Sequence, residues 1–254
     1  MPIELVNSQK DPADAGGLRL VGENRDSSQP LPLEKQFVNF IFLRVDPAWR
    51  QLDQQEKDES KREFEAVFDS FKNDFLLFSY CLVGFDSKAD LMFWRIGRSM
   101  DRIQEMTAAM FRTRLGSFLE TSDSYLAVTK RMMFVPDASS DRFYVTPGEK
   151  KYHFLYPCAK NRDWYEKPPE ERDALIEENF MVGRRFPNIK IHLTHAFGFS
   201  DQEYLISFET DEPKDFLALT EELRQTPAAG FTMRGMPVYT CRQRPLTECL
   251  ESLG

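Results

Sequence analysis

The sequence has few of the residues from which metal centres are built. Its 254 residues include only three histidines and four cysteines, and no two cysteines form a CxxC pair. Structural zinc needs thiolates or imidazoles in close groups, so this scattered set excludes a zinc finger or a zinc ribbon. Unpaired cysteines are typical of a reducing compartment, and we therefore expect a cytoplasmic protein.

Positive charge is also scarce. The 33 lysines and arginines are outnumbered by 41 aspartates and glutamates, which gives a formal net charge of −8. A protein that grips nucleic-acid phosphates needs a basic surface, so we expect no nucleic-acid partner. The chain has no run of about 18 apolar residues, and its first residues contain neither a basic nor an apolar signal region. We therefore predict no membrane span and no secretion signal.

Aromatic residues, in contrast, are abundant. With 22 phenylalanines, 8 tyrosines and 3 tryptophans, the chain can build an aromatic core or line a pocket for an apolar ligand. They are concentrated after residue 36. Residues 1–35 are rich in Gly, Ser, Asp and Pro and have little apolar periodicity, so they predict a flexible N-terminal extension.

The rest of the chain repeats one order of elements. Hydrophobic periodicity predicts strand, helix, strand, strand and helix in residues 36–149, and the same order returns in residues 150–244. At an offset of 114, Phe40 matches Phe154 and Gly84 matches Gly198, which indicates a duplicated unit.

Each unit has the pattern of a ferredoxin-like repeat. The prediction is therefore an α+β fold with the architecture of a dimeric α+β barrel, in which two repeats pack antiparallel sheets together with helices outside. Residues 36–149 form the N-terminal half plus a connector, with a strand-like piece at 142–145. Residues 150–244 form the C-terminal half, and residues 245–254 form a tail.

A group of motifs in the second half resembles the chlorite dismutase and coproheme decarboxylase family. These motifs are YPxxK at Tyr156 to Lys160, the pair Trp164-Tyr165, the pair Gly183-Arg184, and FGFSDQE at residues 197–203. The resemblance runs from about residue 36 to residue 242. It implies haem or coproheme held between the sheet and helices of the second half, and a homo-oligomer in the form of a ring-shaped pentamer.

The resemblance also implies roles for single residues. Tyr156 matches the pocket tyrosine that becomes a radical in coproheme decarboxylases, Lys160 the lysine at the same strand end, and Trp164 a pocket-lining tryptophan. Arg184 is either a propionate contact or structural, and Phe180 is expected to line the pocket. Alternation along the strand agrees, because it places Tyr156 on one face and His153 on the other, between the sheets.

The family's iron ligand is where this sequence departs. The family has a histidine four residues before the Gly of Gly183-Arg184, and this chain has Asn179 there. Leu175, Asn179 and Val182 share one helical face, so Asn179 is a polar residue on an apolar stripe. Haem iron takes imidazole, thiolate, thioether or phenolate, and an amide is a poor substitute.

A second departure lies thirteen residues further on. There the family has an arginine or glutamine above the haem, and this chain has His192. By this match we expect His192 to face the pocket, while His195 on the opposite face of the strand faces the inter-sheet core or a subunit contact.

Three interpretations of the site stay open. His192 binds iron from the side opposite Asn179; or it is an acid/base or hydrogen-bonding group in a pocket without iron; or the pocket is degenerate and the protein is structural. The favoured hypothesis is an altered tetrapyrrole pocket with a peroxidase- or decarboxylase-like oxidoreductase activity that uses Tyr156, Lys160 and His192, rather than efficient chlorite dismutation. The alternative is a haem-free family member that binds another small molecule or serves in assembly.

Overall fold

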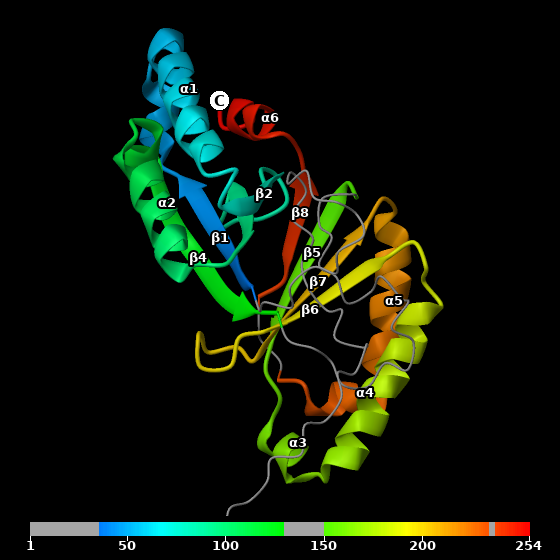
Figure 1. The fold of residues 1–254 in the computed structure, drawn as a ribbon. Helices are drawn as coiled ribbons and strands as arrows, with labels where there is room; N and C mark the ends of the chain where they lie inside the picture. Colours follow the sequence, from blue (N-terminus) through cyan, green and yellow to red (C-terminus); the bar gives the residue numbers. More distant parts are fainter. Residues whose placement is uncertain (1–35, 130–149, 234–236) are drawn as a thin grey trace, which may run out of the picture.

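Eight antiparallel strands close into one barrel, with the helices on its outside (Figure 1). The computed structural model describes residues 36–129, 150–233 and 237–254. The predicted extension 1–35 and the predicted strand 142–145 lie outside these ranges. The strands are β1 (Phe37–Val45), β2 (Phe75–Cys81), β3 (Leu91–Gly97), β4 (Leu119–Val128), β5 (Tyr152–Cys158), β6 (Lys190–His195), β7 (Tyr204–Thr210) and β8 (Tyr239–Gln243).

The helices cover the two halves of the barrel separately. They are α1 (Gln54–Ser70), α2 (Met100–Arg112), α3 (Arg162–Glu166), α4 (Pro169–Arg184), α5 (Pro213–Gln225) and α6 (Leu246–Glu251), with short 3-10 helices η1 (Pro47–Gln51), η2 (Leu115–Phe118) and η4 (Pro227–Phe231). Figure 1 shows α1, α2 and α6 over one half and α3, α4 and α5 over the other. None of the helices in the described ranges is long and apolar enough to cross a bilayer.

The order of strands around the barrel is β1-β3-β2-β8-β5-β7-β6-β4. Each half therefore has its fourth strand beside its first and its third strand between the first and second, which is the ferredoxin-like order. This confirms the predicted α+β fold and its two repeats. The repeats share one continuous barrel rather than two separate sheets, and the ladders that join them are short: β2 pairs with β8 at Tyr80 and Cys81, and β4 pairs with β6 at Val128.

The offset of 114 holds at the turns but not along every strand. Gly84 and Gly198 occupy equivalent hairpin turns and both have the positive φ that favours glycine, 82° and 77°. Phe40, however, packs inside the barrel, whereas Phe154 packs against the helices. A one-residue difference in register moves a side chain to the other face of a strand, so these two phenylalanines are not equivalent.

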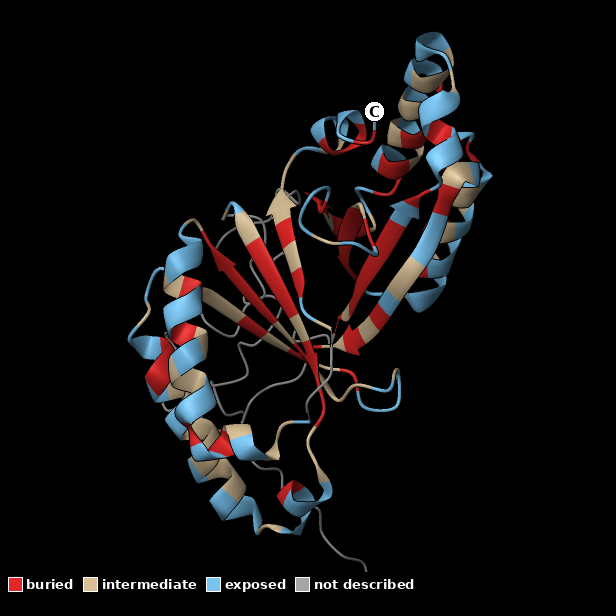
Figure 2. Ribbon diagram, turned by 180° about the vertical axis from the view of Figure 1, so that it is seen from behind, coloured by how far each residue is buried: buried red, intermediate tan, exposed pale blue. Residues whose placement is uncertain are grey.

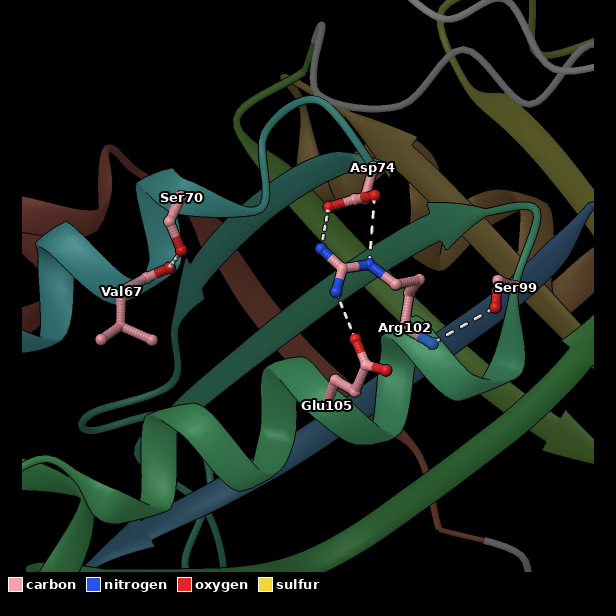
Figure 3. A network of polar contacts seen from close by, with 6 residues as sticks. All are labelled: Val67, Ser70, Asp74, Ser99, Arg102 and Glu105. Carbon is pink, nitrogen blue, oxygen red and sulfur yellow. Dashed lines mark hydrogen bonds and ion pairs between the residues drawn. The ribbon is translucent and has the colours of Figure 1, made fainter.

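Local side-chain bonds fix where the helices of the first half begin and how they attach. The Ser99 hydroxyl accepts the backbone N–H of Arg102 and caps α2 (Figure 3). The Arg102 guanidinium then bonds both carboxylate oxygens of Asp74, at 3.2 and 2.6 Å, and also contacts Glu105. Because Asp74 directly precedes β2, this fork ties the start of α2 to the sheet.

The predicted C-terminal tail is an ordered part of the first half. It forms α6, whose Cys249 and Leu250 are fully buried in the apolar cluster beneath α1 and α2. The Trp49 indole N–H donates to the carbonyl oxygen of Gly254 at 3.0 Å. The chain therefore returns from the second half, through β8, to complete the core of the first.

Candidate functional site

The helices of the second half cover their sheet less completely than those of the first. In the first half α2 buries Ile103, Met106 and Met110, whereas the longer α4 buries only Val182 and Gly183. Figure 2 shows the helices over the second half as largely exposed or partly buried. Four side chains on the helix-facing side of the sheet are only partly buried, namely Tyr156, Ile191, Leu193 and Ile206, although Phe154 and Phe208 on the same side are buried. Apolar side chains left partly uncovered in this way are typical of a surface that binds a ligand or a partner.

One end of α4 packs directly on the sheet. A Cβ at Gly183 would lie 3.1 Å from Cδ1 of Ile191 on β6, so glycine permits this close approach. Asn179 lies one turn earlier on the same inward stripe, and Arg172 two turns before that. We call the contact region between this stripe and the helix-facing side of β5, β6 and β7 the α4 seam.

Two buried polar atoms of the α4 seam lack a hydrogen-bond partner. They are Oδ1 of Asn179 and Nε of Arg172. Buried polar atoms are nearly always bonded in folded proteins, because leaving one unbonded costs about 1–3 kcal/mol. An acceptor and a donor on one helix face suit a ligand that offers the complementary groups.

Tyr156 lies on the helix-facing side, as alternation along β5 predicts. Its ring lies 5.5 Å from that of Phe208 and 5.8 Å from that of Phe216, and Phe216 stacks on Phe154 at 3.8 Å. Burial raises the pKa of the Tyr156 phenol, although the nearby Arg224 opposes the shift. At neutral pH Tyr156 is therefore a protonated hydrogen-bond donor within an aromatic wall.

Lys160 and Trp164 lie together where β5 leads into α3. The Lys160 ammonium donates to the carbonyl oxygen of Ala228 at 3.0 Å and to the hydroxyl of Thr232 at 2.8 Å. It also lies 4.7 Å from the centre of the Trp164 ring, a cation–π distance, and Trp164 itself is buried. Burial lowers the pKa of Lys160.

His192 faces the interior of the barrel, not the α4 seam. Its Nε2 lies 3.0 Å from Oε2 of Glu209, and its ring lies 5.7 Å from that of Trp94. Ile191, the preceding residue, packs on the helix side. The prediction that His192 shares a pocket with Tyr156 is therefore wrong. It depended on a count of residues through the turn before β6, and a one-residue error in such a count reverses the face.

Of the other two histidines, His153 lies where the sequence predicted and His195 does not. His153 is fully buried inside the barrel, as predicted, with its ring 4.9 Å from that of Trp94 and 5.0 Å from that of Tyr80. Burial lowers its pKa to about 4. His195 was expected in the inter-sheet core or at a subunit contact, but it lies on the helix-facing side, next to the rings of Phe197 and Tyr204. The inter-sheet alternative is wrong.

The remaining predicted residues lie around α4 with different exposure. Arg184 is on the outer side, exposed, and its guanidinium contacts the sulfur of Met181 at 3.5 Å. Phe180 is partly buried beside Asn179. Arg172 belongs to the motifs of the family resemblance but was assigned no role from the sequence, although its position seven residues before Asn179 places it on the same helix face.

A model of the chlorite dismutase family matches residues 57–244 of this chain. The chain belongs to the chlorite dismutase family. Across 240 residues it is 24% identical to the chlorite dismutase of Ideonella dechloratans, a match that covers 90% of this chain and 84% of that protein. It is 27% identical over 163 residues to the coproheme decarboxylase of Mycolicibacterium smegmatis, covering 63% of this chain and 70% of the relative.

Solved structures agree with this family. A mutant chlorite dismutase from Candidatus Nitrospira defluvii superposes with a TM-score of 0.79 at 26% identity, covering 85% of this chain and 94% of that one. A protein from Thermus thermophilus, described as haem-binding, superposes with a TM-score of 0.75 over 87% of this chain and 96% of its own. Its identity of 20% supports the shared fold alone.

The side chains around the α4 seam suit an apolar ligand with a carboxylate better than they suit a bound iron ion. The walls of the seam are apolar and aromatic, and its unpartnered Arg172 Nε suits a carboxylate. The inward face of α4, however, offers Asn179 to a metal, and Tyr156 is held in its protonated form. In the part of the chain that the structure describes, no three His, Cys, Asp or Glu side chains are grouped to hold a metal ion.

Proposed function

We propose that the α4 seam binds a tetrapyrrole such as haem or coproheme, without an iron ligand from α4. The observation that carries the proposal is the incomplete cover of the sheet by α4, with the buried Asn179 Oδ1 and Arg172 Nε unpartnered inside it. The coproheme decarboxylase and the chlorite dismutase among the relatives support the ligand class.

The chain's own side chains would bind and orient such a ligand. The Arg172 guanidinium would pair with a carboxylate of the ligand, and the Asn179 amide oxygen would accept a hydrogen bond from it. Tyr156 would hold a proton at its phenol oxygen, facing the ring. A bound haem would supply the one-electron redox chemistry for a peroxidase- or decarboxylase-like activity.

Efficient chlorite dismutation is not part of the proposal. Three side chains of β6 point toward α4, namely Ile191, Leu193 and His195, and none is an arginine. Asn179 faces them from the helix. The family's chlorite chemistry uses a guanidinium on the strand wall and an imidazole on the helix wall, whereas here β6 presents the imidazole of His195 and the helix presents Asn179.

A ligand titration with a matched variant tests the proposal. Coproheme, haem and metal-free coproporphyrin are added to the wild-type protein and to Asn179→His, and absorbance is recorded. We expect the wild type to bind all three with similar affinity, because iron gains no protein ligand from α4. Asn179→His should raise the affinity for the two iron compounds alone, and these complexes should give the absorbance spectrum of an imidazole-ligated iron. Failure of the wild type to bind any tetrapyrrole would refute the proposal.

A second candidate is a haem-free member of the family. Asn179 favours it, because an amide oxygen can accept hydrogen bonds from many small molecules but does not hold haem iron. This candidate predicts that the wild type ignores all three tetrapyrroles and that Asn179→His does not rescue binding. A role in assembly would then remain for the conserved fold.

We further propose that the protein is a cytoplasmic homo-oligomer, and specifically a pentamer, as the resemblance to the family implies. Light scattering of the purified chain measures the mass of the assembly directly. A monomer of 29.7 kDa would contradict the proposal, and a mass about five times larger would support it.

A further inference from the structure

The segment that carries Lys160 and Trp164 is tied down on two sides. On one side is Glu203, just before β7: its backbone N–H donates to the carbonyl oxygen of Cys158 at 3.0 Å, and its carboxylate accepts the backbone N–H of Lys160 at 2.8 Å. The hydroxyl of Tyr165 also bonds to Glu203; burial, and after it this bond, raises the pKa of the Tyr165 phenol.

On the other side is η4 and the residues that follow it. The Asn161 N–H donates to the carbonyl oxygen of Phe231 at 2.8 Å, and the Met233 N–H donates to that of Ala159 at 2.9 Å. The Lys160 side chain crosses between the two segments, since its ammonium bonds Ala228 and Thr232 of the η4 region. The backbone hydrogen bonds and the Lys160 side chain thus join the same two segments, the end of β5 and the η4 region.

The Lys160 ammonium has little left to offer a ligand. It has three N–H donors: one goes to the Ala228 carbonyl, one to the Thr232 hydroxyl, and its charge lies over the Trp164 ring. Turning it toward a ligand would break two hydrogen bonds at a partly buried site and withdraw the cation from the ring.

We infer that Lys160 and Glu203 are positioning residues, which hold Trp164 and η4 as the end wall of the α4 seam, and that Lys160 does not contact the ligand. The identity of the ligand in this inference rests on the proposed function, but the positioning of Trp164 and η4 by Lys160 and Glu203 does not. It assigns to Glu203 a role that its motif alone does not reveal, and it changes the role of Lys160 from a reacting group to a brace.

Two ligands distinguish a brace from a contact. Metal-free coproporphyrin carries four carboxylates, whereas its tetra-amide keeps the flat ring and carries none. If Lys160 is a positioning residue, Lys160→Met should lower the affinity for both ligands alike, by about tenfold. This is the loss expected when a charged hydrogen bond is removed. If Lys160 pairs with a ligand carboxylate, the loss should be confined to coproporphyrin, and the inference would be overturned.

Conservative variants complete the test. Lys160→Arg keeps a cation near the Trp164 ring and should restore most of the affinity lost in Lys160→Met. Glu203→Gln keeps an oxygen that can accept the Lys160 N–H and should behave like the wild type, whereas Glu203→Ala should weaken both ligands. Equal affinities for Glu203→Ala and wild type would contradict the inference. Circular dichroism checks that each variant is folded.

Trp164 emission provides a readout that needs no ligand. The contribution of Trp164 is obtained by subtracting the spectrum of Trp164→Phe, and we expect Lys160→Met to change it in the ligand-free protein, because the cation leaves the ring. An unchanged Trp164 contribution would overturn the inference. If instead the wild type binds no tetrapyrrole but the Trp164 emission changes in Lys160→Met, the proposed function is refuted and the positioning role of Lys160 is supported.

Discussion

The fully buried His153 makes a prediction about acid stability that can be worked out in detail. Burial inside the barrel lowers its pKa to about 4, from 6.5 in an unfolded chain. Between these two pH values the unfolded chain binds a proton that the folded chain does not. The free energy of unfolding therefore rises with pH across this window and is lost as the pH falls from about 6.5 toward 4.

The size of the effect follows from the shift. A difference of about 2.5 pKa units at about 1.4 kcal/mol each gives about 3 kcal/mol of stability that acid removes through this one group. Removing the imidazole should remove that dependence. His153→Phe places a ring of similar size among Phe40, Tyr80 and Trp94, and both ring nitrogens of His153 lack a hydrogen-bond partner to lose.

Urea unfolding at several pH values between 4 and 8, followed by tryptophan fluorescence, measures both quantities. We expect the wild type to lose about 3 kcal/mol more than His153→Phe between pH 6.5 and 4, and the variant to be at least as stable at pH 7. The difference between the two proteins cancels the carboxylates that titrate in both. Parallel curves, or a variant much weaker at pH 7, would show that the imidazole is hydrogen-bonded or charged in the folded protein.

Two further predictions concern packing and polar contacts elsewhere in the barrel. A Cβ at Gly116 would lie 2.0 Å from the carbonyl oxygen of Met110, so Gly116→Ala must move the backbone. We expect this variant to lose about 3 kcal/mol of the free energy of unfolding in urea. A loss near zero would contradict the tight turn after α2. Tyr239→Phe removes the 2.6 Å bond to the Asp123 carboxylate and should cost about 2 kcal/mol at neutral pH. That loss should shrink in an Asp123→Asn background, because the charged acceptor is already gone.

The sequence was sufficient for the fold because periodicity and turn residues are local signals. The alternation along β5 placed Tyr156 and His153 on opposite faces correctly, and the paired glycines Gly84 and Gly198 marked equivalent turns. What local signals do not give is how the two repeats join. One barrel closes through the short ladders β2–β8 and β4–β6. These ladders join residues that are far apart in the sequence, Tyr80 with Gln243 and Val128 with His195, and no pattern within one repeat encodes such pairs.

The site was predicted less well, and the misplaced residues, Phe154, His192 and His195, share one physical cause. The match of Phe40 with Phe154 and the placement of His192 in the pocket each carried a residue count across a turn onto a strand. Along a helix a slip of one residue rotates a side chain by about 100°, but along a strand it reverses the face. Asn179, which lies on a helix, was accordingly placed on the correct inward stripe, whereas His192 was not.

The corrected faces separate two groups of residues that the sequence had merged. Strands β6 and β7 present His192 and Glu209 to the barrel interior, and Ile191 and Phe208 to the α4 seam. His192 therefore belongs with the polar interior of the barrel, where its partner is the buried carboxylate of Glu209, and not with the chemistry of a ligand across the sheet. On the side of the α4 seam, the side chains suited to proton transfer or hydrogen bonding are instead His195 and Tyr156, and burial keeps the Tyr156 phenol protonated at neutral pH. Substituting His192 should consequently lower the free energy of unfolding and leave the tetrapyrrole affinity within a few fold of the wild type. Tyr156→Phe should instead lower the tetrapyrrole affinity and leave the free energy of unfolding nearly unchanged. A His192→Gln variant that folds normally but no longer binds a tetrapyrrole bound by the wild type would contradict this separation.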